Sequence, residues 1–353
     1  MRRIPPSHAE LVYGGRVDCR DPLAVGFAHA GGHVRARFSG TALDFVYRDG
    51  GQGSETATNY FSVVIDDRPP VALKMEPGEK VYPLARALAP GEHAVLVFKR
   101  TEGGQQGQAG SGEGAFLGFR VPEGAELLPP YPRAHRVEFI GDSITCAYGA
   151  GVSTTTPDNA HYTSKNANAY ASWATVTART LDADLMLVCY SGRGAYRNFQ
   201  GGGGDAMPAL YPRTLPDRPT PLWDFSVFEP EVIVVNLGTN DFSPGGVDRE
   251  KFRAAYGAFV ESLRARSPQA TLILAVGPMM SDFWPPNESA WTNIQADVKR
   301  LIDARRTAGD DNVHLLVLPT QQAPYGEDWH PTEAEHARMA ERTVALIRSL
   351  RKW

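Results

Sequence analysis

Four short polar segments contain the residue types that acyl transfer requires. They are Gly-Asp-Ser at 141–143, Tyr-Ser-Gly at 190–192, Gly-Thr-Asn-Asp at 238–241 and Asp-Trp-His at 328–330. A serine hydroxyl becomes a good nucleophile when a histidine accepts its proton, and the same histidine can then protonate the leaving group. The oxyanion that forms needs preorganised N–H donors. Ser143 as nucleophile, His330 as base, and the backbone N–H groups of Ser143 and Gly192 with the side-chain amide of Asn240 would supply these parts.

Each of these residues also has an explanation that involves no chemistry. An isolated Gly-Asp-Ser is more often a polar strand-to-helix turn around a residue such as Ser143. Asn240 could bond to its own backbone as a turn residue, and His330 could stand at the entrance of a helix whose capping box begins at Thr332. All four segments occurring together favour catalysis. Asp241 is expected to be structural and to brace its loop.

Strand and helix patterns alternate in the C-terminal two thirds of the chain. Continuous apolar runs cover 137–140, 185–188, 232–237, 272–276 and 313–318, and helical patterns cover 169–181, 249–266, 289–308 and 332–350. Such runs are typical of parallel strands buried on both faces, so the pattern predicts a doubly wound five-stranded parallel α/β sheet. In such a sheet ligands bind outside the carboxyl ends of the strands. The four polar segments follow the first, second, third and fifth runs, so we expect them to meet at one rim.

The N-terminal third has a periodicity of two. Val34, Ala36 and Phe38 alternate with arginines, and similar short runs recur between turn residues up to about residue 120. This pattern predicts an antiparallel, jelly-roll-like β-sandwich. A glycine-rich segment at 101–114 is expected to be a mobile hairpin loop, and a proline-rich connector follows. We therefore expect an accessory domain at 1–130 and a catalytic domain at 131–353.

The composition is that of an ordinary globular protein. The chain has 353 residues, 42% of them hydrophobic, and a net charge of -4, which excludes a basic nucleic-acid footprint. Apolar runs long enough to span a membrane and the apolar core of a signal peptide are both missing from the sequence as written. The cysteines at 19, 146 and 189 allow at most one disulfide, and none is expected. We see no metal-binding cluster, and the proposed chemistry needs no cofactor.

The four segments resemble a known superfamily when they are taken in order. "FIGDSIT", "YSGRG", "LGTND" and "DWHPT" look like the four sequence blocks of SGNH hydrolases, the GDSL-type esterases. The N-terminal strands, with "NYFSVVID", "FKRTE" and "LGFRVP", are similar to carbohydrate esterase family 2. The resemblance implies an acetyl esterase acting on plant polysaccharides such as xylan or glucomannan, often at the 6-position. It also implies the roles given above to Ser143, Gly192, Asn240 and His330, an acetylated carbohydrate as partner, and a secreted or periplasmic location.

The last block departs from the superfamily pattern. The usual spacing is Asp-x-x-His, whereas here the segment reads Asp328-Trp329-His330. Two alternatives follow: Asp328 is the third member of a triad, or a backbone carbonyl such as that of Trp329 orients the imidazole. Trp329 is also the candidate platform under a sugar, and Tyr196 and Arg193 are candidate residues of the cleft wall.

Two other functions are compatible with the same fold. A lipase, thioesterase or acyltransferase would act on another acyl group, but the polar, glycine-rich loops do not suggest a trench for a long chain. An inactive carbohydrate-binding protein would have lost the nucleophile or the base, and both are present. The glycines at 201–204 lack the spacing and the Lys-Ser/Thr pair of a phosphate loop, so 200–222 is expected to be a long flexible loop near the site.

Overall fold

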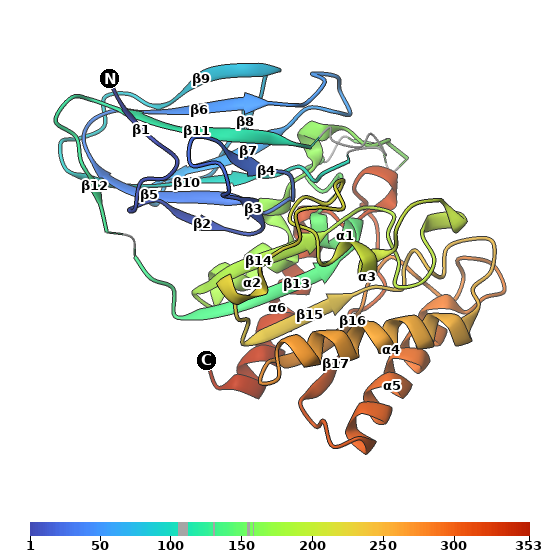
Figure 1. The fold of residues 1–353 in the computed structure, drawn as a ribbon. Helices are drawn as coiled ribbons and strands as arrows, with labels where there is room; N and C mark the ends of the chain where they lie inside the picture. The colour runs from blue at the N-terminus through green and yellow to red at the C-terminus, as the bar shows by residue number, and fades with distance from the viewer. Residues whose placement is uncertain (105–111, 130, 154–155, 158) are drawn as a thin grey trace.

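The computed structural model describes residues 1–104, 112–129, 131–153, 156–157 and 159–353. Figure 1 shows an antiparallel sandwich, in blue and blue-green, packed beside a parallel sheet that helices cover. The predicted fold class is therefore confirmed. Residue 130, at the expected domain boundary, and residues 105–111 of the glycine-rich segment lie outside the described residues.

The sandwich consists of two antiparallel sheets. The first contains β3 (Val17–Asp18), β4 (Val25–Phe27), β11 (Gly114–Val121), β6 (Leu43–Asp49) and β9 (Gly78–Ala85), with β1 (Arg2–Ile4) paired to β11. The second contains β12 (Leu127–Leu128), β5 (His33–Ser39), β10 (Glu92–Lys99), β7 (Tyr60–Ile65) and β8 (Val71–Lys74), with β2 (Val12–Gly14) paired to β5. Val34, Ala36 and Phe38 of β5 are buried in the core between the sheets, as their alternation with arginines predicts.

The C-terminal sheet is entirely parallel, in the order β14-β13-β15-β16-β17. Its strands are β13 (His135–Gly141), β14 (Ala183–Cys189), β15 (Val232–Asn236), β16 (Thr271–Val276) and β17 (Val313–Val317). The chain leaves β13 toward β14 on one side and then returns to β15 on the other side. The topological switch point therefore lies between β13 and β15, where such sheets bind ligands.

Helices cover both faces of this sheet. The long helices are α2 (Trp173–Thr180), α4 (Arg249–Arg266), α5 (Ala290–Thr307) and α6 (Glu333–Arg351). The shorter ones are α1 (Ser143–Cys146), α3 (Met207–Leu210), η2 (Ser164–Asn166), η3 (Ala169–Ala171), η4 (Phe199–Gly201), η5 (Phe225–Val227) and η6 (Glu327–Trp329). Apolar side chains of α4 and α5 share one buried cluster with the sheet, and those of α2 and α6 share the other. Both faces of the strands are thus buried, which explains their continuous apolar runs.

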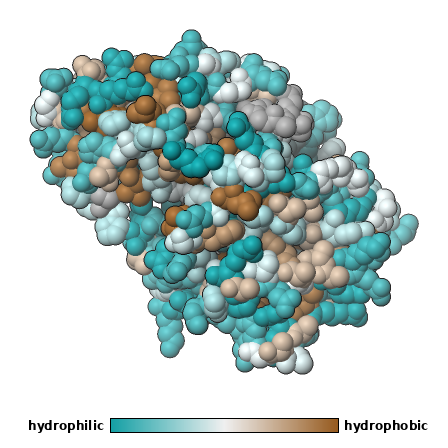
Figure 2. Space-filling view, in the orientation of Figure 1, coloured by the Kyte–Doolittle hydropathy of each residue, from teal (hydrophilic) through white to brown (hydrophobic). Residues whose placement is uncertain are grey.

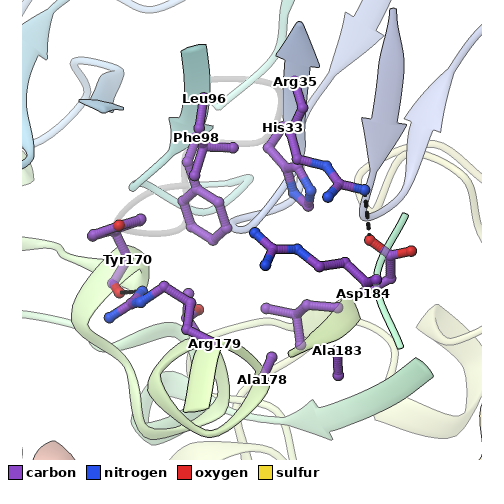
Figure 3. Close-up of a pocket in the computed structure, with 12 residues that line it drawn as sticks. His33, Arg35, Leu96, Phe98, Tyr170, Ala178, Arg179, Ala183 and Asp184 are labelled. Atoms are coloured by element: carbon purple, nitrogen blue, oxygen red, sulfur yellow. Dashed lines mark hydrogen bonds and ion pairs between the residues drawn. The ribbon is translucent and has the colours of Figure 1, made fainter. Parts of the chain in front are cut away.

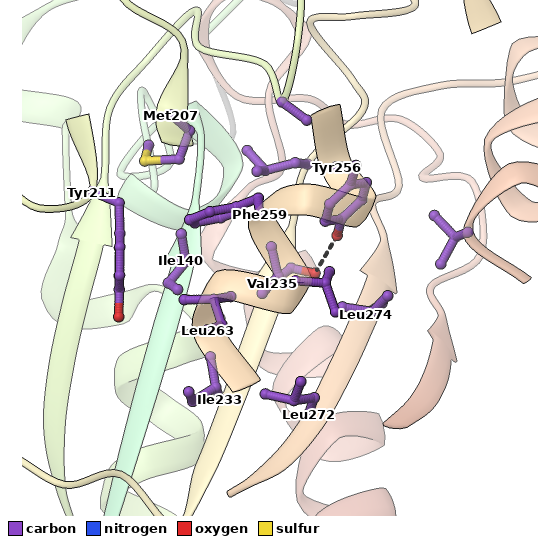
Figure 4. Packing of buried hydrophobic residues seen from close by; sticks show 14 of the residues in the cluster. Ile140, Met207, Tyr211, Ile233, Val235, Tyr256, Phe259, Leu263, Leu272 and Leu274 are labelled. Carbon is purple, nitrogen blue, oxygen red and sulfur yellow. Dashed lines mark hydrogen bonds between the residues drawn. The ribbon is translucent and has the colours of Figure 1, made fainter. Parts of the chain in front are cut away.

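The segment 200–222, expected to be a flexible loop, is partly built into the core. Met207 and Tyr211 are 1% and 2% exposed. Figure 4 shows both beside Ile140 of β13 and Phe259 of α4. The segment also contains α3 and a β-bridge between Arg213 and Leu222. The expectation of flexibility is therefore wrong for these packed residues, because apolar side chains anchor them.

The expectation of no disulfide is wrong as well. Cys146 and Cys189 are joined by a disulfide, with their Cα atoms 5.6 Å apart. Cys146 ends α1, which follows β13, and Cys189 ends β14, the parallel neighbour of β13. Only the pairing of these two strands brings the cysteines within bonding distance. Cys19 is free and exposed.

The second sheet of the sandwich packs directly on the unit that contains the parallel sheet. Ala30 and Phe98 belong to the buried cluster that α2 and α6 make with the parallel sheet. Figure 3 shows a pocket at this contact, where Arg35 of β5 forms an ion pair with Asp184 of β14 at 2.7 Å. The two units therefore share apolar and charged contacts.

The outer face drawn in Figure 2 is mainly hydrophilic, and its hydrophobic side chains form small groups. Among the residues that the structure describes, no helix is long and apolar enough to cross a bilayer.

Candidate active site

Ser143 stands where β13 ends and α1 begins. The Asp142 side chain caps this short helix by accepting the Ile144 N–H at 3.0 Å. Ser143 is 7% exposed, and its Oγ lies 2.8 Å from Nε2 of His330. The structure thus brings together two residues that are 187 positions apart in the chain, at hydrogen-bond distance. This is the contact that a histidine needs to accept the proton of a serine nucleophile.

Backbone carbonyls orient the imidazole of His330. Its Nδ1 lies 3.0 Å from the carbonyl oxygen of Glu327 and 3.1 Å from that of Asp328. Because both atoms are acceptors, we assign the ring proton to Nδ1, which leaves Nε2 as the acceptor for the Ser143 hydroxyl. The carbonyls face the ring because the chain turns through left-handed conformations, with φ of 50° at Asp328 and 59° at Trp329.

The Asp328 carboxylate binds groups other than the imidazole of His330. Its oxygens accept hydrogen bonds from the Tyr148 hydroxyl at 2.8 Å and the Tyr162 N–H at 3.0 Å, and Nδ1 of His161 lies 2.8 Å away. These donors lower the pKa of Asp328 although its partial burial acts to raise it. The Asp328 carboxylate therefore does not lie against Nδ1, because the left-handed turn directs the Asp328 carbonyl toward the imidazole instead.

A second carboxylate, which the sequence analysis did not identify, holds the same turn. Glu327 is 2% exposed, and its carboxylate accepts hydrogen bonds from the Thr163 N–H and hydroxyl, both at 2.7 Å. A third bond comes from the side-chain amide of Asn166 at 2.6 Å. Thr163 and Asn166 belong to the connection between β13 and β14, so this long connection supports the histidine turn. Only the position of Glu327 beside the Asp-Trp-His segment could have suggested this role.

Asn240 is bonded to Asp142 of the first polar segment and to Arg193, which directly follows the second. Its side-chain nitrogen donates to the carbonyl of Arg193 at 2.9 Å and to the carboxylate of Asp142 at 3.2 Å. Arg193 follows Gly192, and Asp142 precedes Ser143. To bind an oxyanion, one amide hydrogen must leave its present acceptor, and the longer bond to Asp142 is the weaker of the two.

Gly192 lies in the left-handed region, with φ of 77°. A Cβ at this position would meet only Phe199, at 3.9 Å, so the glycine serves backbone conformation rather than a crowded contact. The next turn is braced by Asp241, whose carboxylate accepts the N–H groups of Ala195 at 2.9 Å and Tyr196 at 2.7 Å. The prediction that Asp241 is structural agrees with these bonds, although the loop that it holds is the one after Gly192.

Aromatic side chains at this rim remain exposed. Trp329 is 53% exposed and Tyr196 is 36% exposed. The Trp329 carbonyl accepts a hydrogen bond from Gln321 at 2.6 Å, so it is not the carbonyl that orients the imidazole. Arg193 donates to the carbonyl of Gly203 at 2.9 Å and lies over the Tyr190 ring, which directs it along the loop.

Within the described ranges, no group of three or more His, Cys, Asp or Glu residues could hold a metal ion.

The burial of His330 predicts an unusually acidic pH limit for activity. Desolvation lowers its pKa to about 4, although hydrogen bonds to the two carbonyls act in the opposite direction. The base should therefore stay neutral well below pH 6.5, the ordinary pKa of a histidine side chain. We expect the acid limb of kcat/KM for a soluble acetyl ester to have its midpoint near pH 4, because kcat/KM reports ionisation of the free enzyme.

Low pH also affects folding, so this measurement needs a control. A histidine whose pKa is lowered in the folded state takes up protons more readily when unfolded, so stability falls as pH drops below about 6.5. Rates should be taken after short exposure, and full activity should return at neutral pH. Asp142 also titrates within this pH range, because burial raises its pKa to about 7. Its protonation should leave the helix cap in place, since a protonated carboxyl still has an oxygen that accepts the Ile144 N–H. A reversible limb centred near pH 6.5 would contradict the prediction.

Comparisons with known proteins agree with both halves of the structure. The family model described as carbohydrate esterase 2 N-terminal matches residues 13–131, and that of the GDSL-like lipase/acylhydrolase family matches residues 139–338. The cellulase/esterase CelE of Acetivibrio thermocellus is 36% identical over 345 residues, which are 97% of this chain and 40% of that protein. An acetylxylan esterase / glucomannan deacetylase of Cellvibrio japonicus is 32% identical over 346 residues, covering 94% of this chain and 88% of that protein.

Solved structures show the same relationship over the whole fold. A family two carbohydrate esterase from Clostridium thermocellum, solved in complex with cellohexaose, has a TM-score of 0.88 and 36% identity, covering 97% of this chain and 99% of that chain. One from Cellvibrio japonicus has a TM-score of 0.86 and 26% identity, covering 100% of this chain and 98% of that chain. The similarity extends through the sandwich and the parallel sheet in the same order, and this chain therefore belongs to carbohydrate esterase family 2, whose catalytic domain is that of a GDSL-type serine esterase.

Proposed function

We propose that this enzyme removes O-acetyl groups from plant polysaccharides or oligosaccharides, such as xylan and glucomannan, through a serine acyl-enzyme. The observation that carries the proposal is the 2.8 Å contact between Ser143 Oγ and His330 Nε2 at the rim of the sheet. The name acetylxylan esterase / glucomannan deacetylase, borne by relatives of similar length, supports the substrate class. The 6-position of a hexose is the acetylated hydroxyl that we would test first.

The first half of the reaction forms the acyl-enzyme. Ser143 Oγ attacks the acetyl carbonyl carbon while Nε2 of His330 accepts the hydroxyl proton. The backbone N–H groups of Ser143 and Gly192 and the amide of Asn240 are the proposed donors to the oxyanion. Each such donor typically lowers the barrier by about 2.7–4 kcal/mol. His330 then gives its proton to the sugar oxygen as the ester C–O bond breaks.

The second half returns the enzyme to its starting state. A water molecule attacks the acetyl group on Ser143 while His330 accepts one of its protons. Collapse of the tetrahedral intermediate releases acetate, and the proton passes to Ser143. In both halves the imidazolium is stabilised by the carbonyls of Glu327 and Asp328, whose dipoles replace the charge of a triad carboxylate at Nδ1.

Acetate release tests this function and its alternatives. Acetylated xylan, acetylated glucomannan and a 6-O-acetylated hexose are incubated with the enzyme and with Ser143→Ala, and acetate is measured. Release that depends on Ser143 supports the proposal, and the order of rates identifies the substrate. A series of p-nitrophenyl esters separates acetyl preference from a lipase or thioesterase. No release from any ester by the folded protein would instead favour a carbohydrate-binding function.

We predict that Trp329→Ala weakens polysaccharide binding and leaves chemistry intact. Trp329 is 53% exposed beside the base, where its ring can stack on a sugar. Loss of an aromatic contact worth about 0.5–1.5 kcal/mol corresponds to a KM higher by roughly two- to tenfold on acetylated glucomannan. kcat on p-nitrophenyl acetate should not change, and Trp329→Phe should recover most of the affinity. An unchanged KM in the alanine variant would remove Trp329 from the binding site.

Two further assignments belong to the same proposal. We propose that residues 1–130 form the accessory unit and residues 131–353 the catalytic unit, because the sandwich ends with β12 and the parallel sheet begins with β13. We also propose that the enzyme is secreted or acts in the periplasm, where it would meet its polysaccharide substrates. Fractionation of the source cells, followed by the acetate assay on each fraction, tests this location.

A further inference from the structure

One carboxylate of the β-sandwich reaches the loop that carries Gly192. Glu102 follows β10 and is 4% exposed. One of its oxygens accepts the backbone N–H of Ser191 at 2.6 Å, and the other accepts the Ser191 hydroxyl. Ser191 immediately precedes Gly192. A residue of the N-terminal unit is therefore bonded twice to the residue before the proposed oxyanion donor.

Buried polar contacts hold Glu102 in place from the sandwich side. The preceding residue, Thr101, is fully buried, and its hydroxyl donates to the side-chain oxygen of Asn59 at 3.0 Å. The Asn59 amide in turn donates to Asp49 at 2.6 Å. The ammonium of Lys99, also fully buried, donates to the Thr101 carbonyl at 2.6 Å. These contacts correct the expectation of a mobile loop for residues 101 and 102, since Thr101 is bonded within the sandwich and Glu102 to Ser191.

The loop on the catalytic side depends on few other bonds near this point. The Tyr190 N–H donates to the carbonyl of Gly141 at 3.1 Å, and the Gly192 carbonyl accepts the Phe199 N–H at 2.9 Å. A longer turn bond, from the Arg193 N–H to the Tyr190 carbonyl at 3.4 Å, spans Ser191 and Gly192. Between the first two anchors the chain turns into the left-handed conformation of Gly192, with φ of 77°. The direction of the Gly192 N–H is set by the peptide plane that joins it to Ser191. Two hydrogen bonds from Ser191 to Glu102 hold the residue on one side of this peptide, and the bond from Phe199 holds Gly192 on the other side.

We infer that Glu102 is a positioning residue for the reaction, through which the β-sandwich holds the Ser191–Gly192 peptide in its oxyanion-binding orientation. This inference rests on the proposed role of Gly192 as an oxyanion donor. It makes the sandwich a working part of the catalytic centre in addition to any role in binding sugar. Through Glu102, the N-terminal unit then contributes to kcat by way of Ser191 and Gly192.

Glu102→Ala and Glu102→Gln test the inference in the full-length protein. We expect Glu102→Ala to lower kcat on p-nitrophenyl acetate by roughly 10- to 100-fold, since a small misplacement of a catalytic group can cost about 100-fold. KM should change little. Glu102→Gln should recover most of kcat, because its amide oxygen can accept the Ser191 N–H while its NH₂ group donates to the hydroxyl. Burial raises the pKa of Glu102 to about 7, although its hydrogen bonds with Ser191 act to lower it.

Arg35→Ala is the matched control for a purely structural role. It removes another contact between the two units, the 2.7 Å ion pair with Asp184 shown in Figure 3. Asp184 lies at the start of β14, seven residues before Ser191, which places it roughly 20 Å from the Ser191–Gly192 peptide. We expect Arg35→Ala to lower Tm and to leave kcat unchanged. If Glu102 only joined the two units, Glu102→Ala would behave in the same way, and that result would overturn the inference.

Two more variants separate the possible failures. Ser191→Ala removes one of the two bonds without altering the sandwich, and we expect a smaller loss of kcat at an unchanged Tm. In protein that already carries Glu102→Ala, Ser191→Ala should cause no further loss of kcat, because the two residues act as a unit. If Glu102→Ala does not fold, wild-type kcat in Ser191→Ala would still overturn the inference. Ser143→Ala is assayed in parallel: activity in that variant would reject the proposed function itself, whereas its inactivity beside a fully active Glu102→Ala would reject only the role of Glu102.

Discussion

Replacing Ser143 by alanine should reduce ester hydrolysis to the level of the oxyanion site and substrate binding alone. The substitution removes only the hydroxyl group, whose oxygen lies 2.8 Å from Nε2 of His330. Removing the nucleophile of a serine hydrolase typically lowers kcat by roughly 10⁶-fold. We expect no acetate release above background from acetylated xylan or from p-nitrophenyl acetate, measured over hours at high enzyme concentration.

The control for this variant is its folded state. Ser143 starts a helix that Asp142 caps, so alanine keeps the helix and its cap. Tm should therefore remain close to that of the wild type, and binding of an acetylated oligosaccharide should persist in calorimetry. If more than about one per cent of the activity survived in protein purified away from host esterases, another nucleophile would have to be sought.

Replacing His330 by alanine should be as damaging as the loss of Ser143, whereas Asp328→Asn should be nearly silent. The first effect follows because nucleophile and base act as one unit, so either loss removes the whole mechanism. The second follows from the contacts of Nδ1, which lies 3.0 Å and 3.1 Å from two backbone carbonyls. In an enzyme whose carboxylate orients the histidine, an Asp-to-Asn change lowers kcat by about 10⁴-fold. Here we expect a loss of no more than about tenfold.

Asparagine is a fair replacement because it preserves most of what Asp328 does. Its amide oxygen can still accept the N–H of Tyr162 or the hydroxyl of Tyr148. Asparagine also tolerates the left-handed backbone, which Asp328 adopts with φ of 50°. Rates on p-nitrophenyl acetate, measured at several pH values, give the comparison. A loss of about 10⁴-fold in Asp328→Asn at unchanged Tm would restore Asp328 as the third member of a triad.

The parts of the site that the sequence predicted depend on local pattern. Continuous apolar runs identified the strands, and each polar segment followed directly after one of them. Parallel strands place their carboxyl ends at one edge, so Ser143 and Asn240 could be assigned to one rim without any knowledge of contacts. The structure then adds the contact between Ser143 Oγ and His330 Nε2, at 2.8 Å.

The features that were missed all depend on where a side chain points or on residues far apart in the chain. Spacing could not show that a left-handed turn sends the Asp328 carboxylate toward Tyr148 and its carbonyl toward His330. The glycine-rich composition around Glu102 suggested mobility, because composition does not show that the carboxylate would be buried against Ser191. The cysteines lie in unrelated segments of the sequence, which suggested that no disulfide forms. The pairing of β13 with β14 brings Cys146 and Cys189 together.

The sequence by itself determined the order of the two units, the parallel sheet and the residue types that meet at its rim, because periodicity and strand ends are local properties. Only the tertiary structure decided which groups contact Nδ1 of His330 and which residue of the sandwich contacts Ser191. The turn that presents two carbonyls to His330 is held by bonds of its carboxylates to Tyr148 and Thr163, and Ser191 donates to Glu102, 89 residues away. Such bonds form when packing buries a polar group and leaves it a single set of partners, and no local pattern encodes that outcome.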